Sequence, residues 1–113
     1  MKRIAVAGPY STGGADAELR AARLAEMNRA ALAVFEKGWA PVIGVNIALP
    51  VIETAGEERF AEIMQPLSNA VVADCAAILR IGGPSQGADE EVGIVRANGG
   101  AVYRAIEDVP DLT

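Results

Sequence analysis

Apolar residues follow two kinds of spacing along this chain. Short, almost continuous apolar runs are bounded mostly by Gly, Pro or Asn, and such runs predict β-strands rather than helices. The first ends at Gly8-Pro9 and the third at Gly82-Gly83-Pro84. The predicted strands cover residues 2–7, 40–45, 76–81 and 101–104.

Between the first two runs the spacing becomes helical. Leu24, Met27 and Ala31, followed by either Val34 or Phe35, recur at steps of three and four residues. This spacing predicts a helix over residues 16–37 with one apolar face. Gly38 follows it as the expected C-terminal cap.

Two further helices are predicted, over residues 57–73 and 88–97. Pro66 lies inside the first of them and should break or kink it. Residues 46–54 show no clear pattern, and Pro50 there favours an irregular link. Residues 106–112 form a short tail.

The order β-α-β-α-β-α-β predicts an α/β fold in one domain that covers residues 1–113. Apolar strands joined by helices indicate a parallel sheet covered on both faces. We therefore expect a Rossmann-like or flavodoxin-like three-layer sandwich with four to five strands. Hydrophobic residues make up 51% of the chain but aromatic ones only 4%, so the core must consist of small aliphatic side chains.

Composition excludes several kinds of function. The net charge is −5 and the basic residues are scattered, which is atypical of nucleic-acid binding. No apolar run approaches the roughly 20 residues of a membrane span. The apolar part of the N-terminus stops after about five residues, short of the roughly 7–15 in an export signal. We therefore expect a cytoplasmic protein that binds neither nucleic acid nor membrane.

The chain has no histidine and a single cysteine, Cys75. The absence of histidine excludes Ser-His and Cys-His nucleophile pairs and argues against a zinc site. Cys75 begins an apolar run, and we expect it to be buried and unreactive. Neither a Walker-type phosphate loop nor a G-x-G-x-x-G turn is present. We expect no metal ion and no cofactor.

Two Gly-rich loops follow the first and third predicted strands, at residues 8–14 and 82–88. Both lie where parallel α/β sheets bind ligands, and both lead into a helix N-terminus with free backbone N–H groups. The Ser85 hydroxyl is suited to bind a phosphate or ribose oxygen. Tyr10 is suited to stack on a base or to bind a sugar. The alternatives are an ordinary strand-to-helix turn and a tyrosine that packs on its own loop.

Glu91 follows the second of these loops. We expect it in the first turn of its helix, where the helix dipole would keep the carboxylate ionised at neutral pH. An ionised, positioned carboxylate can attack an anomeric carbon and form a glycosyl ester. The alternative is that Asp89, Glu90 and Glu91 only complement the helix dipole.

Several segments together resemble the nucleoside 2-deoxyribosyltransferase superfamily, in particular its short bacterial branch. Gly8-Pro9-Tyr10 is similar to the family's opening loop. The most diagnostic stretch is Ala73 to Leu79 followed by Ser85-x-Gly87-x-x-x-Glu91-x-Gly93. The helix that contains Asn28 and ends at Gly38, the segment Ala40-Pro41-Val42 and the strand Ala101-Val102-Tyr103 also fit the family's pattern.

The resemblance implies a catalytic role for Glu91 as the nucleophile that takes the deoxyribosyl group from the base. It further implies substrate binding by Gly8, Pro9, Tyr10, Ser85 and Gly87. In the related 2′-deoxynucleoside 5′-phosphate N-hydrolases, the residues that match Ser85 and Gly87 contact the 5′-phosphate. The partner would then be a nucleoside or nucleotide, and the protein a homodimer or higher homo-oligomer. A Gly-Gly…Gly…Glu turn also resembles the cytokinin-activating phosphoribohydrolases, whose arginine motif is missing here.

One departure keeps a second hypothesis open. The family places an aspartate about eight residues before the position of Asp74, whereas this chain has Met64, Gln65, Pro66 and Leu67 there. The first hypothesis is a hydrolase or transferase that cleaves an N-glycosidic bond. The second is a non-catalytic nucleotide-binding module on the same fold, and the third is a structural protein with a vestigial cleft.

Overall fold

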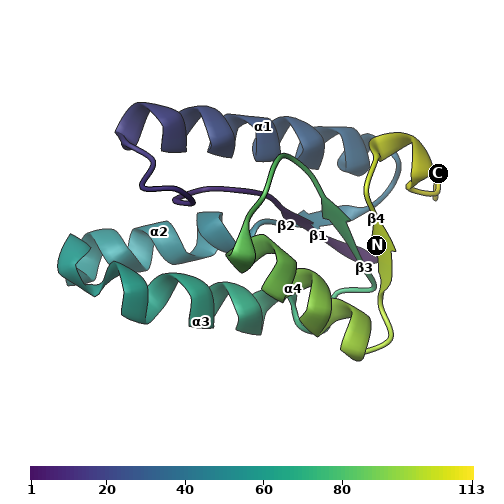
Figure 1. Ribbon diagram of the computed structural model, residues 1–113. Helices are drawn as coiled ribbons and strands as arrows, with labels where there is room; N and C mark the ends of the chain where they lie inside the picture. Colours follow the sequence, from purple (N-terminus) through teal and green to yellow (C-terminus); the bar gives the residue numbers. More distant parts are fainter.

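The computed structural model describes residues 1–113 and confirms the predicted α/β class. A four-stranded, all-parallel sheet lies between α1 on one face and α2, α3 and α4 on the other (Figure 1). The strand order is β2-β1-β3-β4. The elements are β1 (Arg3–Ala7), α1 (Ala17–Glu36), β2 (Ala40–Val42), α2 (Gly44–Ala55), a 3₁₀ turn (Glu57–Arg59), α3 (Phe60–Val72), β3 (Ala77–Arg80), α4 (Gln86–Ala97), β4 (Ala101–Tyr103) and a second 3₁₀ turn (Ile106–Asp108).

The central strand β1 pairs with β2 on one side and with β3 on the other. Ala5 is level with Val42 of β2 and with Ile78 of β3. The chain thus leaves β1 toward one edge of the sheet and later returns to its other side at β3. Such a reversal opens a crevice at the carboxyl ends of the strands. Both Gly-rich loops start at this crevice.

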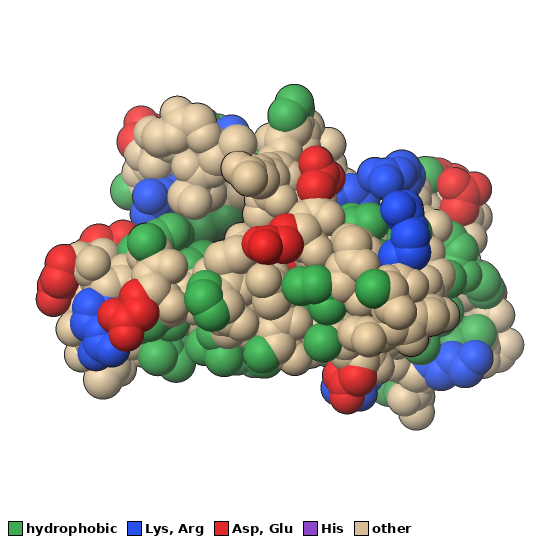
Figure 2. Space-filling view, turned by 60° about the horizontal axis from the view of Figure 1, so that its bottom comes forward, with side chains coloured by type: hydrophobic (Ala, Val, Ile, Leu, Met, Phe, Trp, Pro, Cys, Tyr) green, Lys and Arg blue, Asp and Glu red, His purple; other side chains and the backbone are tan.

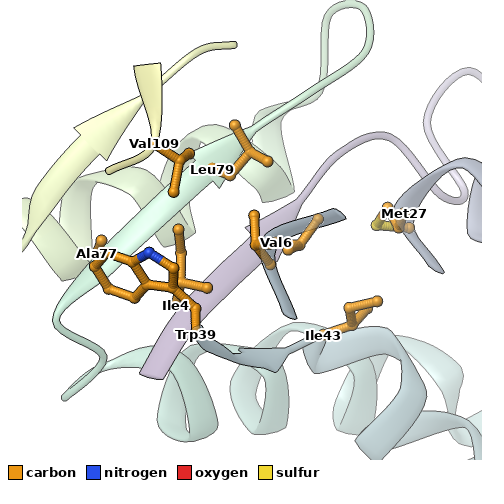
Figure 3. Packing of buried hydrophobic residues seen from close by; sticks show 9 residues of the cluster. Ile4, Val6, Met27, Trp39, Ile43, Ala77, Leu79 and Val109 are labelled. Carbon is orange, nitrogen blue, oxygen red and sulfur yellow. The ribbon is translucent and has the colours of Figure 1, made fainter. Parts of the chain in front are cut away.

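Alternating residues of the strands face the two helical layers. Ile4 and Val6 point toward α1, whereas Ala5 and Ala7 point toward α3 and α4. Small alanines on the second face let α4 lie close to the sheet. The larger cluster, on the α1 side, comprises Ile4, Val6, Met27, Val34, Trp39, Ile43, Ala77, Leu79 and Val109 (Figure 3).

Helix α1 agrees with its prediction within one residue at each end. Asp16 is its N-cap and accepts a hydrogen bond from Leu19 N at 2.9 Å. Gly38 follows the helix with a φ of 93°, a conformation that side-chain-bearing residues rarely adopt. Either Val34 or Phe35 was expected to end the apolar face of this helix. Val34 is buried, whereas Phe35 is 52% exposed, so Val34 is the core residue.

This difference in burial predicts unequal effects of truncation. Val34→Ala removes two buried carbons and should lower the free energy of unfolding by about 2 kcal/mol. Phe35→Ala, although it removes more atoms, should change it by less than about 0.5 kcal/mol because the ring is exposed. Urea denaturation of both variants provides the measurement. A larger loss in the Phe35 variant would contradict this assignment of the core face.

The irregular link expected at residues 46–54 is wrong, because α2 occupies Gly44–Ala55. Pro50 lies inside this helix and removes one backbone hydrogen bond. The loss is offset by packing of α2 against α3, where Ala48 and Ile52 are buried with Met64. The contact begins at Gly44, where a Cβ atom would come within 2.6 Å of the Cβ of Ser68. The second predicted strand is accordingly shorter and ends at Val42.

Of the break or kink expected at Pro66, the break is absent. Helix α3 runs from Phe60 to Val72 through this proline. Only the first turn of the predicted helix differs, because residues 57–59 form a 3₁₀ turn. One face of α3 is anchored by the buried residues Met64, Ser68 and Val72, and this packing holds the helix together across the missing hydrogen bond.

The C-terminal segment is fastened to the end of α1. Lys37 Nζ donates hydrogen bonds to the carbonyl oxygens of Ile106 and Val109, both at 2.8 Å. The indole N–H of Trp39 donates to the carbonyl of Pro110 at 2.7 Å. Val109 is buried in the α1-side core. The tail is therefore part of the packed domain.

Two observations bear on the remaining expectations from composition. Cys75 is 4% exposed, and burial raises the pKa of its thiol. None of the helices is long and apolar enough to cross a membrane.

Candidate functional site

A cavity of about 110 Å³ lies at the crevice between the two Gly-rich loops. Loop residues after β1 form one wall, and the start of α4 forms another. Helices α2 and α3 close it from the side opposite α1. Its lining comprises Gly8, Tyr10, Ser11, Thr12, Val45, Met64, Gln65, Ser68, Ser85, Gly87, Ala88 and Glu91. We call this the Glu91 cavity.

Five of the six residues singled out from the sequence meet in this cavity, namely Gly8, Tyr10, Ser85, Gly87 and Glu91. Pro9 does not. It borders a separate hollow of about 240 Å³ with Gly82, Gly83 and Arg23. Gly82 has a φ of 76°, and a Cβ atom there would come within 2.7 Å of the Pro9 ring. Pro9 thus has a packing role against the second loop.

The two loops are connected directly. Thr12 Oγ1 lies 3.2 Å from Ser85 Oγ across the crevice. Arg23 of α1 holds the first loop by donating to the carbonyl oxygens of Tyr10 and Thr12, at 3.1 and 2.8 Å. The first loop is therefore fixed by both α1 and the second loop.

Ser85 is the N-cap of α4. Its Oγ accepts a hydrogen bond from Ala88 N at 3.2 Å, and its side chain is nearly buried. The backbone N–H groups of Gln86 and Gly87, in the first turn, have no acceptor within the helix. The end of α4 thus presents backbone donors to the cavity in addition to the hydroxyl of Ser85, which suits a phosphate or sugar oxygen.

Gln65 is one of the residues at the place where the resemblance to the nucleoside 2-deoxyribosyltransferase superfamily predicts an aspartate. Its Nε2 donates to the carbonyl of Gly87 at 3.1 Å and to Asn69 Oδ1 at 2.8 Å. A Cβ atom on residue 87 would collide with Gln65 Oε1, so this contact requires glycine or a shifted glutamine. Gln65 therefore ties α3 to the N-terminus of α4.

Glu91 is the only carboxylate in the cavity lining and is just 8% exposed. Its side-chain carboxylate makes no hydrogen bond or ion pair with another group of the protein; the one ion pair on α4 is that of Asp89 with Arg80. No fully buried polar side-chain atom in the chain lacks a partner. The carboxyl oxygens of Glu91 must therefore reach the open space of the cavity.

The expected position and ionisation of Glu91 need correction. Helix α4 begins at Gln86, so the first-turn acid is Asp89 and Glu91 lies in the second turn. The dipole's influence fades beyond the first turn. Burial instead raises the pKa of Glu91 to about 7, with a further contribution from Glu90. The carboxyl group is thus roughly half protonated at neutral pH.

The positive charge of Arg80 partly opposes this shift in pKa. Its buried guanidinium donates to Asp89 Oδ1 at 3.0 Å and to Gly83 O at 2.9 Å, and it also bonds Ile81 O. Arg80 therefore holds the second loop against α4. No Lys or Arg side chain lines the Glu91 cavity itself.

The face of the molecule seen in Figure 2 shows no concentration of one charge. Acidic and basic side chains are spread over the face that carries α3 and α4, with apolar areas between them (Figure 2). Asp74 lies on the surface, paired with Arg3 at 2.8 Å, and takes no part in the cavity. No three His, Cys, Asp or Glu side chains come together as a metal site.

Sequence reasoning missed Ser68, Val45 and Met64 as lining residues. Val45 was assigned to a strand, because helix α2 was not predicted. Ser68 carried a weak signal as a lone small polar residue on the apolar face of α3. Its hydroxyl lies 3.7 Å from the Met64 sulfur, at the floor of the cavity.

Comparison with known proteins adds no assignment. No protein-family model matches the sequence, and no curated protein matches it with significant similarity.

Proposed function

We propose that this protein cleaves or transfers the N-glycosidic bond of a nucleoside or a (2′-deoxy)nucleoside 5′-monophosphate. The observation that carries the proposal is the state of Glu91. This carboxylate is nearly buried, has no partner within the protein and reaches a cavity made by two Gly-rich loops at the carboxyl ends of adjacent strands. Burying an unpaired acid in such a place costs stability, and a chemical role at this position would explain that cost.

The geometry supports a covalent route. The ionised carboxylate of Glu91 attacks the anomeric carbon, the bond to the base nitrogen breaks, and the electron pair leaves with the base. Water or a second base then releases the sugar from the glycosyl ester. Hydroxyls of Ser11, Thr12 and Ser85 and the free N–H groups of α4 surround the place where sugar or phosphate oxygens would lie.

The motifs Gly8-Pro9-Tyr10 and Ser85-x-Gly87-x-x-x-Glu91 support the same proposal, because they resemble those of the nucleoside 2-deoxyribosyltransferase superfamily. We also propose a cytoplasmic location and a homo-oligomeric state. The resemblance implies the homo-oligomeric state.

One observation favours the alternative of a non-catalytic nucleotide-binding module. The cavity holds a single carboxylate, and Gln65 and Met64 stand in the region of the family's aspartate. Without a second acid, the proton for the departing base must come from solvent, because the attacking Glu91 carboxylate carries none. A binding module would be stabilised by ligand without releasing base.

The test is chromatography after incubating the purified protein with a panel of 2′-deoxynucleosides and their 5′-monophosphates. We expect free base from at least one substrate, and its identity names the substrate. Addition of a second free base separates the two reactions, because a transferase forms a new nucleoside and a hydrolase does not. If no member of the panel releases base, the enzymatic proposal is rejected.

A further inference from the structure

The hollow of about 240 Å³ that Pro9 borders lies between α1 and the two Gly-rich loops. It is on the opposite face of the sheet from the Glu91 cavity, which α2, α3 and α4 surround. The loop after β3 rises toward α1 at this place (Figure 1). The lining of the hollow includes Leu19, Arg23, Glu26, Ile81, Gly82 and Gly83. We call it the α1 hollow.

The guanidinium of Arg23 is only partly used by the protein. Its Nη1 donates to the carbonyl oxygens of Tyr10 and Thr12, whereas Nε and Nη2 make no hydrogen bond. Because no fully buried polar side-chain atom lacks a partner, these two nitrogens reach open space. Nε–H and one Nη2–H form an edge of the planar guanidinium that matches the two oxygens of a carboxylate.

Arg23 and Glu26 line the same hollow without forming an ion pair. The four ion pairs of the protein join other residues. Opposite charges three residues apart on a helix are neighbours and usually attract each other, but here the Glu26 carboxylate stays beyond ion-pair distance of the guanidinium. The α1 hollow therefore presents one cation and one anion that are held apart.

The other lining residues add hydrogen-bond donors and aliphatic surface. The backbone N–H groups of Gly82 and Gly83 donate to no group of the protein. Leu19, which is 44% exposed, and Ile81 contribute aliphatic side chains. At about 240 Å³ the hollow is below the roughly 300–1,000 Å³ of sites for drug-sized molecules, so it suits a smaller ligand.

We propose that the α1 hollow binds an α-amino acid with an aliphatic side chain, in its zwitterionic form. The carboxylate accepts hydrogen bonds from the free edge of Arg23, with the N–H groups of Gly82 and Gly83 as further donors. The ammonium group pairs with Glu26, and the aliphatic side chain contacts Leu19. A simple anion would be repelled by Glu26, and a simple cation by Arg23, whereas a zwitterion matches both charges.

Isothermal titration calorimetry of the intact protein tests the ligand class. L-leucine is compared with 4-methylpentanoate, which lacks the ammonium group, with 3-methylbutylamine, which lacks the carboxylate, and with glycine, which lacks the aliphatic side chain. We expect L-leucine to bind, and each of the other three to bind about 10-fold more weakly or worse, because each leaves one part of the hollow without its partner.

A pair of variants on α1 tests the site itself. Glu26→Gln should weaken L-leucine binding about 5-fold or more, because the ammonium group loses its counter-charge, and should not weaken the binding of 4-methylpentanoate. Glu36→Gln is the matched control, since Glu36 is an exposed acid on the same helix outside the hollow, and it should bind L-leucine like the wild type. Arg23 is left in place because it also holds the first loop.

Three results would overturn the inference: no binding of L-leucine by the wild type at millimolar concentration, binding of 4-methylpentanoate as tight as that of L-leucine, or equal L-leucine affinity in the two variants. The inference does not depend on the proposed function. Glu91→Gln should bind L-leucine like the wild type whether or not the protein releases base, and a loss of binding in that variant would place the amino acid in the Glu91 cavity and refute the α1 hollow.

Discussion

Glu91→Gln should abolish base release, lowering turnover by at least about 10³-fold. Removing an attacking nucleophile typically costs several powers of ten. Gln is nearly isosteric with Glu, so the shape of the cavity and the capping of α4 by Ser85 should persist. The measurement is the rate of base release on the best substrate, at pH 8, where the wild-type carboxyl is mostly ionised.

Glu90→Gln is the matched control for this prediction. Glu90 is the neighbouring acid on α4, but it is exposed and does not line the cavity. Its charge contributes to the raised pKa of Glu91. The Glu90 variant should therefore keep its turnover at pH 8 and reach half its maximal rate at a lower pH than the wild type. Turnover retained by Glu91→Gln would remove Glu91 from the mechanism.

The same Glu91→Gln substitution should stabilise the fold at high pH. The pKa of Glu91 rises from 4.5 to about 7 on folding, so the native state binds its proton more tightly than the unfolded state does. The contribution of the Glu91 carboxyl to the free energy of unfolding is then fully present below pH 4.5, decreases as the pH rises, and is lost above pH 7. The shift corresponds to a loss of roughly 3 kcal/mol. Gln has no charge to desolvate and avoids that loss.

Urea denaturation at pH 4 and pH 8 checks this prediction. The free energy of unfolding of Glu91→Gln minus that of the wild type should be larger at pH 8 by up to about 3 kcal/mol. Glu90→Gln should show a small difference, because Glu90 is exposed. A Glu91→Gln effect that is the same at both pH values would mean that this carboxyl is not buried in the folded protein.

The secondary structure was predictable where a single local pattern dominates. The strands β1 and β3 follow from apolar runs, and the helix α1 follows from its helical spacing of apolar residues and from Gly38. Helix α2 was not predictable in this way, because Pro50 signals a break that only packing against α3 overrides. The same applies to Pro66, whose cost is offset by contacts between residues distant in the sequence.

The candidate site was likewise predictable only in part. The convergence of Ser85, Gly87 and Tyr10 follows from loop positions at the carboxyl ends of adjacent strands. The ionisation of Glu91 depends on how deeply α3 and the first loop cover it, and on a helix start that shifts the residue from the first turn to the second. Gln65 reaches Gly87 across 22 positions, a contact that no local pattern contains.

The hydrogen bond from Trp39 to Pro110 provides an intrinsic spectroscopic reporter. Trp39 is the only tryptophan in the chain, and it precedes β2 at the amino ends of the strands, opposite the Glu91 cavity. Its emission should shift to the red when the C-terminal segment detaches and water reaches the indole. Ligand binding at the cavity should leave it unchanged. Tryptophan fluorescence can thus follow detachment of the tail and global unfolding during a titration without interference from the bound ligand.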